Sequence, residues 1–190
     1  IKLLLGVKLS ASLLSDESGA SLIAEGRTVK KQDISKFEKE RSSEDDVAIY
    51  QAATARFYNA VYTFPKPTIA MIRGYCIGGG MGLAVACDIR LCEDKSRFAV
   101  PAAKLGLGYG YDGVRRLSHL VGPSMVKEIF FTSRQFTAQE AYDMGLANRV
   151  LPPHMLDAYV SDYAKRISEN APMTMVSIKS ITHEIAKEES

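Results

Sequence analysis

The sequence lacks the features that would assign it to several special classes of protein. No apolar run in its 190 residues is long enough to cross a bilayer, no stretch is densely basic, and no segment is of low complexity. The formal net charge is only +2, so charge gives no indication of nucleic-acid binding. With 46% hydrophobic and 24% charged residues, the composition is that of one soluble globular domain with no membrane partner.

Cysteine is scarce, and its positions suggest neither a metal site nor a disulfide framework. Cys76, Cys87 and Cys92 lie in apolar surroundings without the spacing of metal ligands, so we expect buried free thiols and no metal. The short apolar segment after Ile1 lacks the length and flanks of a secretory signal. Free thiols and the missing signal together predict a cytoplasmic protein.

Glycine, in contrast, is concentrated in the run Ile77-Gly78-Gly79-Gly80-Met81-Gly82. The pattern predicts a buried strand over residues 68–72, a bend over 73–75, and a short buried helix over 81–87 that Asp88 ends. Glycines at a strand-to-helix turn leave free amide hydrogens at the positive end of the helix, where an oxyanion or a phosphate fits. A P-loop needs a Lys-Ser/Thr pair after the glycines, and a dinucleotide site needs Gly-x-Gly-x-x-Gly, but neither is present. An oxyanion site and simple tight packing remain as the two interpretations.

Strands and helices alternate along the rest of the chain, which is typical of the α/β class. Ser43 opens one helix, which Pro65 stops. Thr137 and Glu140 form a capping box for a helix that ends at Gly145. The remaining predicted elements are strands over 89–93, 97–100 and 146–151, helices over 114–120 and 124–132, and a long helix after Pro153.

The glycine run and its surroundings closely resemble the signature of the crotonase (enoyl-CoA hydratase/isomerase) superfamily. The similarity spans roughly residues 33–172. It rests on segment 66–90 and, in the family's order, on 97–101, 104–108, 116–117, 121–122, 138–141 and 144–150.

This resemblance implies a spiral of ββα repeats with a helical carboxyl-terminal region. We expect residues 1–150 to form the spiral core and residues 151–190 to begin the helical region. It also implies a homotrimer or a dimer of trimers. Relative to the family, we expect the amino-terminal strands to be short or absent and the chain to stop before the final helices. A splice across missing residues just before Asp33 would explain why Lys31-Gln32 stand where the family has Gly-Ala.

The family acts on acyl-CoA thioesters, so coenzyme A would enter as part of the substrate and no covalently bound cofactor is expected. Two backbone amides of such proteins stabilise an enolate-like oxyanion. By position these are Gly79 and, with Lys31-Gln32 where the family has Gly-Ala, Gln32. The resemblance further implies a substrate site formed by Asp33, Ile34, Phe37, Gly78, Gly80, Ala102 and Tyr109.

The acid and base of the family's hydratases are absent from this sequence. Two glutamates activate water in those enzymes, and their positions here are Gly82 and Ala102, which cannot move a proton. The nearest acid is Asp112, either catalytic or the cap of the helix near Val114. Tyr109 and Tyr111 are either proton donors or packing residues, and His119, His154 and His183 are expected to be surface or structural residues.

Three classes of function therefore stay open. The first is an enoyl-CoA hydratase/isomerase type of enzyme, a lyase of fatty acid metabolism. The second is other enolate chemistry on the same fold, such as decarboxylation or thioester hydrolysis. The third is a CoA-ester-binding protein without turnover.

Overall fold

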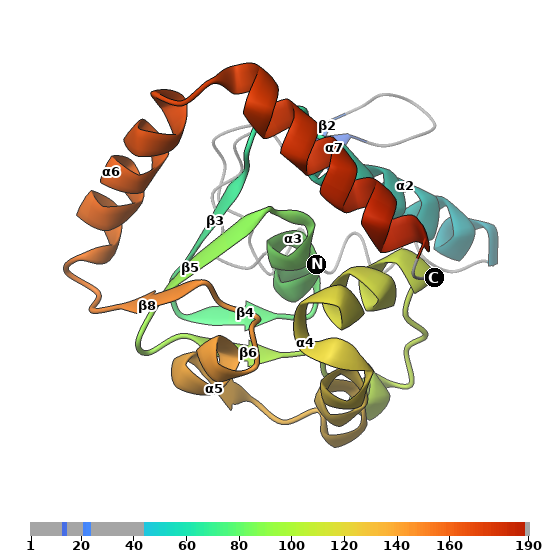
Figure 1. Ribbon diagram of the computed structural model, residues 1–190. Helices are drawn as coiled ribbons and strands as arrows, with labels where there is room; N and C mark the ends of the chain where they lie inside the picture. Colours follow the sequence, from blue (N-terminus) through green and yellow to red (C-terminus); the bar gives the residue numbers. More distant parts are fainter. Residues whose placement is uncertain (1–12, 15–20, 24–43, 189–190) are drawn as a thin grey trace. The chain divides into compact units, whose positions relative to one another are not determined.

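The computed structural model describes residues 13–14, 21–23 and 44–188, in two units that divide between Phe57 and Tyr58 (Figure 1). In the first unit, strand β1 (Leu13–Leu14) pairs antiparallel with β2 (Ser21–Ile23). Helix α2 (Glu44–Tyr62) begins in the first unit, and its last turn belongs to the second. The predicted site residues Gln32, Asp33, Ile34 and Phe37 lie outside the described residues.

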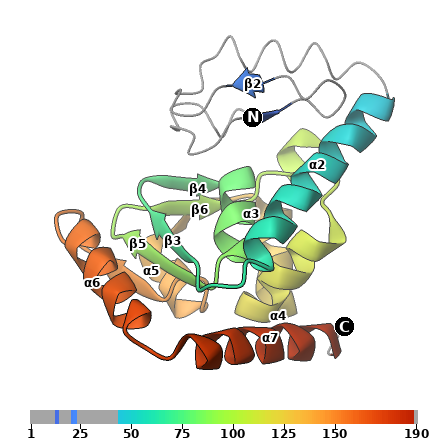
Figure 2. The same ribbon diagram turned by 90° about the horizontal axis from the view of Figure 1, so that it is seen from above.

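Two three-stranded sheets form the centre of the second unit (Figures 1 and 2). One sheet is parallel, with β5 (Ile89–Glu93) between β3 (Ile69–Ile72) and β8 (Arg149–Leu151). In the other, β6 (Arg97–Ala99) pairs parallel with β4 (Tyr75–Ile77) and antiparallel with β7 (Phe136–Thr137).

The order of these strands along the chain produces a spiral of ββα turns. A turn at Gly74, whose φ of +63° favours glycine, carries the chain from β3 into β4 and thus into the other sheet. Helix α3 (Gly79–Ala86) then returns the chain to the first sheet, where β5 pairs with β3. The next strand, β6, pairs with β4 in the other sheet. The ββα fold expected from the sequence is confirmed.

The helices cover the strands and form the carboxyl-terminal region. Helix α3 packs against β4 and α4, and α6 packs against β3 and β5 (Figures 1 and 2). The remaining helices are η2 (Ala103–Leu105), α4 (Tyr111–Thr132), α5 (Ala138–Asp143), α6 (Leu156–Ser168) and α7 (Pro172–Glu188).

Three predicted boundaries differ from the structure. Helix α3 begins at Gly79 instead of Met81, and α4 begins at Tyr111 because the extended Gly110 precedes it. Strand β8 begins only at Arg149. The two helices predicted over 114–120 and 124–132 are parts of the single helix α4, and the break between them is a kink at Gly122 (φ 79°, ψ 159°).

Two turn features were correctly predicted from residue type alone. Thr137 accepts a hydrogen bond from the Glu140 amide, and the Glu140 carboxylate accepts one from the Thr137 amide, which completes the capping box. These contacts, with the nearby Arg134, lower the pKa of Glu140 to about 2. After α5, Gly145 takes the expected left-handed conformation with φ +82°.

The core lies between the sheets, α3, α4 and α5, and its largest members are Phe98, Phe136, Met81, Ile129 and Leu146. The prediction of a wholly buried strand over 68–72 is wrong for Met71, which is 45% exposed. Successive side chains of a strand point to opposite faces, so Met71 lies on the face of the edge strand β3 opposite to that of the buried Ile72.

The cysteines behave as buried thiols in two of three cases. Cys76 and Cys92 are buried, Cys87 is half-buried, and all three are free. Burial raises the pKa of Cys76 to about 12 and that of Cys92 to about 11, and it also raises the pKa of Cys87. None of these thiols is therefore ionised near neutral pH.

A buried arginine connects α3 to the segment between α5 and β8. Arg90 is 3% exposed. Its guanidinium donates to the backbone oxygens of Leu146 at 2.7 Å and Cys87 at 2.7 Å, and its own amide donates to Asn148 Oδ1 at 2.8 Å. Burial lowers the pKa of Arg90, but carbonyl oxygens at the carboxyl end of α3 favour the cation.

We expect Arg90→Met to lower the free energy of unfolding by about 2–6 kcal/mol. The substitution leaves the Leu146 and Cys87 oxygens without this donor, and each buried unsatisfied group costs about 1–3 kcal/mol. The measurement is urea denaturation, with Arg149→Met as control. The side chain of the exposed Arg149 donates to the oxygen of the adjacent Asn148. Its loss should change stability by less than about 0.5 kcal/mol. Equal midpoints for the two variants would contradict the structural role of Arg90.

Candidate active site

The glycine run forms a turn that leads directly from β4 into α3. Gly78 has φ 57° and ψ −111°, a conformation that requires glycine, and its amide donates to the Ala99 oxygen at 2.9 Å. The first helical hydrogen bond runs from the Gly82 amide to the Gly78 oxygen at 2.9 Å. The turn is thus attached to β6 on one side and continues as a helix on the other.

The amides of Gly79, Gly80 and Met81 are the first in α3 and have no acceptor within the helix. The helix has no acidic residue in its first turn, and its residues from Met81 to Ala86 are mostly buried. An anion at this end would therefore meet free donors, the positive end of the helix dipole and surroundings of low polarity. Such donors at a helix amino end are features of an anion site.

A tyrosine occupies the space beside Gly82. A β-carbon on Gly82 would lie 2.9 Å from Cζ of Tyr58, closer than such contacts allow. The Tyr58 hydroxyl donates to the Gly79 oxygen at 3.1 Å. The sequence analysis did not single out Tyr58, although its helical spacing from Thr54 and Tyr62 places all three on one face of α2.

The second position expected to carry a glutamate lies in the core. Ala102 is 7% exposed and belongs to the main hydrophobic cluster. It precedes η2, and its oxygen accepts from the amides of Leu105 and Leu107, both at 3.0 Å. An alanine here adds no proton-transfer group.

Asp112 lies at the surface, in the first turn of α4. Its carboxylate is 3.6 Å from the Arg115 guanidinium, and its side chain is 50% exposed. The expectation that Asp112 caps a helix starting near Val114 is wrong, because α4 begins at Tyr111 and Gly110 holds the cap position. As a residue of the first turn it still interacts favourably with the helix dipole.

The aromatic and histidine candidates either pack against another ring or lie at the surface. The Tyr109 ring meets Phe130 edge to face at 4.9 Å, and Tyr111 is 68% exposed. His183 stacks on Tyr62 at 4.0 Å, and burial lowers its pKa. His119 and His154 are exposed, as expected. Within the part of the chain that the structure describes, no group of three metal-ligating side chains gathers, and no helix is long and apolar enough to span a membrane.

A separate groove of about 370 Å³ lies beneath α7. Its lining is mainly apolar, from residues such as Pro67, Ile89 and Ile178. At its floor Lys179 contacts the Asp88 carboxylate at 2.7 Å, which also accepts from the Thr68 amide. These charges are already paired, so the groove is not the candidate active site.

The chain is similar to known proteins in sequence and in fold. The family model described as enoyl-CoA hydratase/isomerase matches residues 32–190. The short-chain-enoyl-CoA hydratase of Clostridium acetobutylicum is 40% identical over 110 residues, which are 58% of this chain and 42% of that protein. The chain spans about half the length of the curated relatives it matches.

Two solved structures share the fold. An enoyl-CoA hydratase/carnithine racemase from Magnetospirillum magneticum is 32% identical with a TM-score of 0.76, over 80% of this chain and 57% of that chain. A methylmalonyl CoA decarboxylase complexed with 2S-carboxypropyl CoA is 29% identical with a TM-score of 0.68, over 70% of this chain and 51% of that chain.

We expect Gly82→Ala to destabilise the protein although Gly80→Ala does not. Both changes add a methyl group to α3 and gain up to about 1 kcal/mol of helix propensity. At Gly82 the new β-carbon collides with Tyr58, and such overpacking costs about 1–3 kcal/mol, whereas nothing lies within 4 Å at Gly80. Thermal unfolding of the two variants measures the difference. A Gly82→Ala protein as stable as Gly80→Ala would show that the Tyr58 ring does not fill this space.

Proposed function

The chain belongs to the enoyl-CoA hydratase/isomerase family, and from this premise we propose that it processes acyl-CoA thioesters by stabilising a thioester enolate. The observation that carries the proposal is the glycine turn at the half-buried start of α3. The Gly79 amide, the first in the helix, has no acceptor within α3. We propose the Gln32 amide as the second donor, from its position in the sequence.

The proposed chemistry begins when the thioester oxygen accepts hydrogen bonds from these two amides. In water addition, the water oxygen bonds to the β-carbon of an enoyl ester while its proton passes to a base. The electron pair of the C=C bond then moves through the α-carbon onto the thioester oxygen, and the enolate forms with its charge beside the helix end. One such donor commonly contributes about 2.7–4 kcal/mol of transition-state stabilisation. Coenzyme A takes part as a portion of the substrate.

The remaining site residues are proposed to hold the substrate. Gly78 and Gly80 allow the thioester to approach the backbone, because neither carries a side chain. Asp33, Ile34 and Phe37 belong to the segment that the family resemblance links to the substrate. Ala102 and Tyr109 complete the proposed set, and the exposed edge of Tyr109 supports its accessibility to a ligand.

Water addition needs groups that the site lacks at the two usual positions. Gly82 and Ala102 cannot act as acid or base, so we propose Asp112 as the proton-transfer group of any hydration. Its half-exposed carboxylate supports access to solvent and substrate.

Decarboxylation is the second candidate, and the missing acids favour it. When a carboxylated acyl-CoA loses carbon dioxide, the electron pair of the broken C–C bond becomes the enolate, so no base is needed to form it. One proton then has to reach the α-carbon. The similarity to a methylmalonyl CoA decarboxylase structure supports this candidate, and thioester hydrolysis or ester binding without turnover are the further alternatives.

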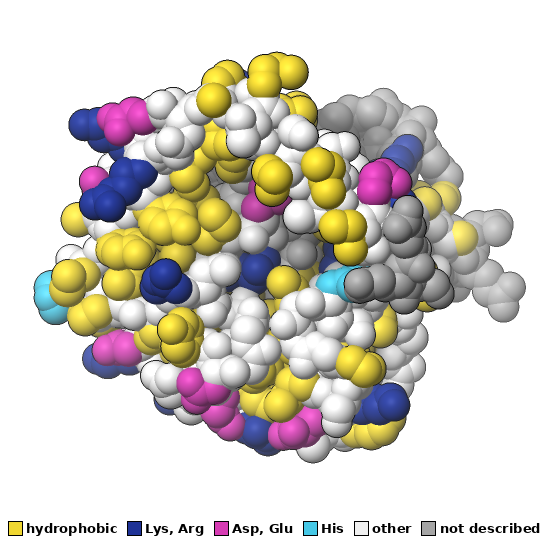
Figure 3. All heavy atoms as spheres, in the orientation of Figure 1, with side chains coloured by type: hydrophobic (Ala, Val, Ile, Leu, Met, Phe, Trp, Pro, Cys, Tyr) yellow, Lys and Arg dark blue, Asp and Glu magenta, His cyan; other side chains and the backbone are white. Residues whose placement is uncertain are grey.

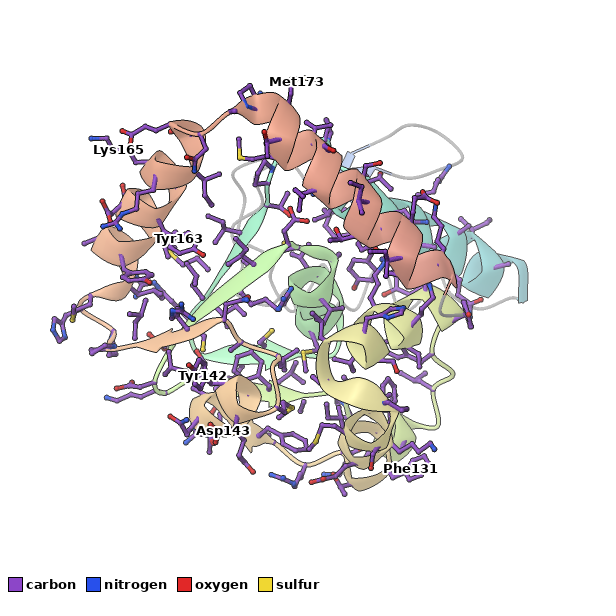
Figure 4. All side chains as sticks on the ribbon, in the orientation of Figure 1. Phe131, Tyr142, Asp143, Tyr163, Lys165 and Met173 are labelled. Atoms are coloured by element: carbon purple, nitrogen blue, oxygen red, sulfur yellow. The ribbon has the colours of Figure 1, made fainter. Side chains whose placement is uncertain are left out.

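We further propose a homotrimer or dimer of trimers, a lyase activity in fatty acid metabolism and a cytoplasmic location. The apolar surface supports assembly (Figures 3 and 4). Exposed hydrophobic side chains lie along α7, including Met173 at 77% and Ile178 at 57%, whereas Phe131, 78% exposed, lies apart from them on α4 (Figures 3 and 4). Large exposed apolar patches commonly mark interfaces.

A panel of CoA esters tests the proposed function. The full-length protein is incubated with enoyl-, dienoyl-, malonyl- and 3-oxoacyl-CoA esters, and the products are identified by mass. Addition of water or movement of a double bond supports the first candidate, and loss of carbon dioxide supports the second. Binding of the esters without any product would contradict both catalytic candidates.

We expect Gly79→Pro to abolish turnover while Gly79→Ala retains a measurable rate. Proline removes the amide hydrogen, and the first position of a helix tolerates it, whereas alanine adds a β-carbon but keeps the N–H. Losing one oxyanion donor typically costs about 10²–10³ in kcat. The comparison is made on the ester identified above, after circular dichroism shows that both variants are folded. Equal rates for the two variants would remove Gly79 from the oxyanion role.

We expect crotonyl-CoA hydration to be at least about 10²-fold slower than in a two-glutamate enzyme. Each positioned acid or base typically contributes about 10²–10⁴-fold, and both usual positions lack one. Any residual rate should fall in Asp112→Asn and stay unchanged in Asp143→Asn, a matched change on the exposed face of α5 (Figure 4). Rapid hydration that Asp112→Asn leaves undiminished would show that another group moves the proton.

A further inference from the structure

Tyr58 makes two contacts with the glycine run that the proposed chemistry does not yet use. Its hydroxyl donates to the Gly79 oxygen at 3.1 Å, and its ring lies where a side chain on Gly82 would begin. The two glycines lie on one helical turn of α3, so a single side chain contacts both. The first of them carries the amide proposed as an oxyanion donor.

The last turn of α2, which carries Tyr58, is attached to α4 by its neighbouring residues. The Arg116 guanidinium lies over the Tyr62 ring, 4.3 Å from its centroid, and donates to Asn59 Oδ1. Arg116 is 6% exposed, and α4 itself packs against α3. The residues on either side of Tyr58 in this turn are therefore attached by a buried arginine to α4, the helix that also packs against α3.

Adjacent glycines have unusually large backbone freedom, and an oxyanion donor must point in one direction. On one side, the Gly78 amide is fixed by its bond to the Ala99 oxygen. On the other side, the Tyr58 hydroxyl holds the Gly79 oxygen. The Gly79 amide lies along the backbone between these two hydrogen bonds. It therefore has little freedom to turn away from a bound ligand.

We propose that Tyr58 is a positioning residue of the oxyanion site. It fixes the direction of the Gly79 amide through the Gly79 oxygen, and its ring reserves the space beside position 82 so that only glycine fits there. This inference rests on the proposed function, because it assigns a role within that site. It acts through Gly79, and it does not require the phenol to exchange a proton with the substrate.

The test combines a readout of the turn with a readout of catalysis. Tyr58→Phe keeps the ring and removes the hydroxyl, and Tyr142→Phe on α5 is the matched control, because Tyr142 is 45% exposed and lies on another helix (Figure 4). In protein labelled with ¹⁵N-glycine, the Gly80 amide reports the Gly79 oxygen, since both belong to one peptide group. Steady-state kinetics on the CoA ester identified by the panel give kcat, KM and their pH profiles.

We expect Tyr58→Phe to shift the Gly80 resonance and to lower kcat about 3- to 10-fold, the range that one neutral hydrogen bond supplies. KM should stay within about twofold, because the ester's other contacts are intact. The shape of the kcat pH profile should not change. Tyr142→Phe should match the wild type in all of these measurements.

Three results would overturn the inference: an unmoved Gly80 resonance, an unchanged kcat, or a pH profile that loses a limb, which would make the phenol a proton donor. If the wild type converts no CoA ester, the proposed function fails. The Gly80 resonance then decides alone, a shift in Tyr58→Phe supporting the contact and its absence refuting it. Should Tyr58→Phe not fold, Gly82→Ala displaces the ring while keeping the hydroxyl. The same Gly80 shift and kcat loss are then expected, and their absence counts against the proposal.

Discussion

The buried guanidinium of Arg90 is the interaction on which the arrangement of this protein depends. It binds backbone oxygens at the carboxyl end of α3 and the Leu146 oxygen before β8, two segments far apart in the sequence. Among the described residues, its guanidinium donates to backbone oxygens and to the Asn148 amide oxygen, so neutral carbonyl dipoles compensate the cost of burying the charge. With its carboxyl end fixed in this way, α3 can present its amino end and the glycine turn at a constant place in the core.

That constancy matters because the glycine turn itself has little intrinsic rigidity. Three glycines in sequence allow close approach of a ligand, but they also leave the backbone free to adopt many conformations. The structure restricts them from outside, through the Ala99 oxygen, the Tyr58 hydroxyl and the helix that starts at Gly79. Position 82 requires glycine for a different reason, because the Tyr58 ring leaves no room for a β-carbon there.

The chemistry proposed for the site follows from an imbalance between its two parts. The part proposed to stabilise negative charge consists of amides that have no acceptor within α3, at its half-buried amino end. The part that moves protons is weak, because Gly82 and Ala102 hold no acid and Asp112 lies half-exposed beside Arg115. Reactions in which the enolate forms without a base depend mainly on the first part, whereas water addition depends on both. This difference is the physical reason for weighing decarboxylation beside hydration.

The sequence by itself determined the class of fold, the strand-to-helix glycine turn, the capping box at Thr137 and the absence of acids at positions 82 and 102. All of these depend on local residue types or on a motif whose members are close along the chain. Only the tertiary structure decided that α3 begins at Gly79, that Met71 is exposed, and that Asp112 follows a helix start instead of capping one. It also brought Tyr58 to Gly82 and Arg90 to Leu146, because such contacts join separate segments and depend on how the helices pack, which no local pattern encodes.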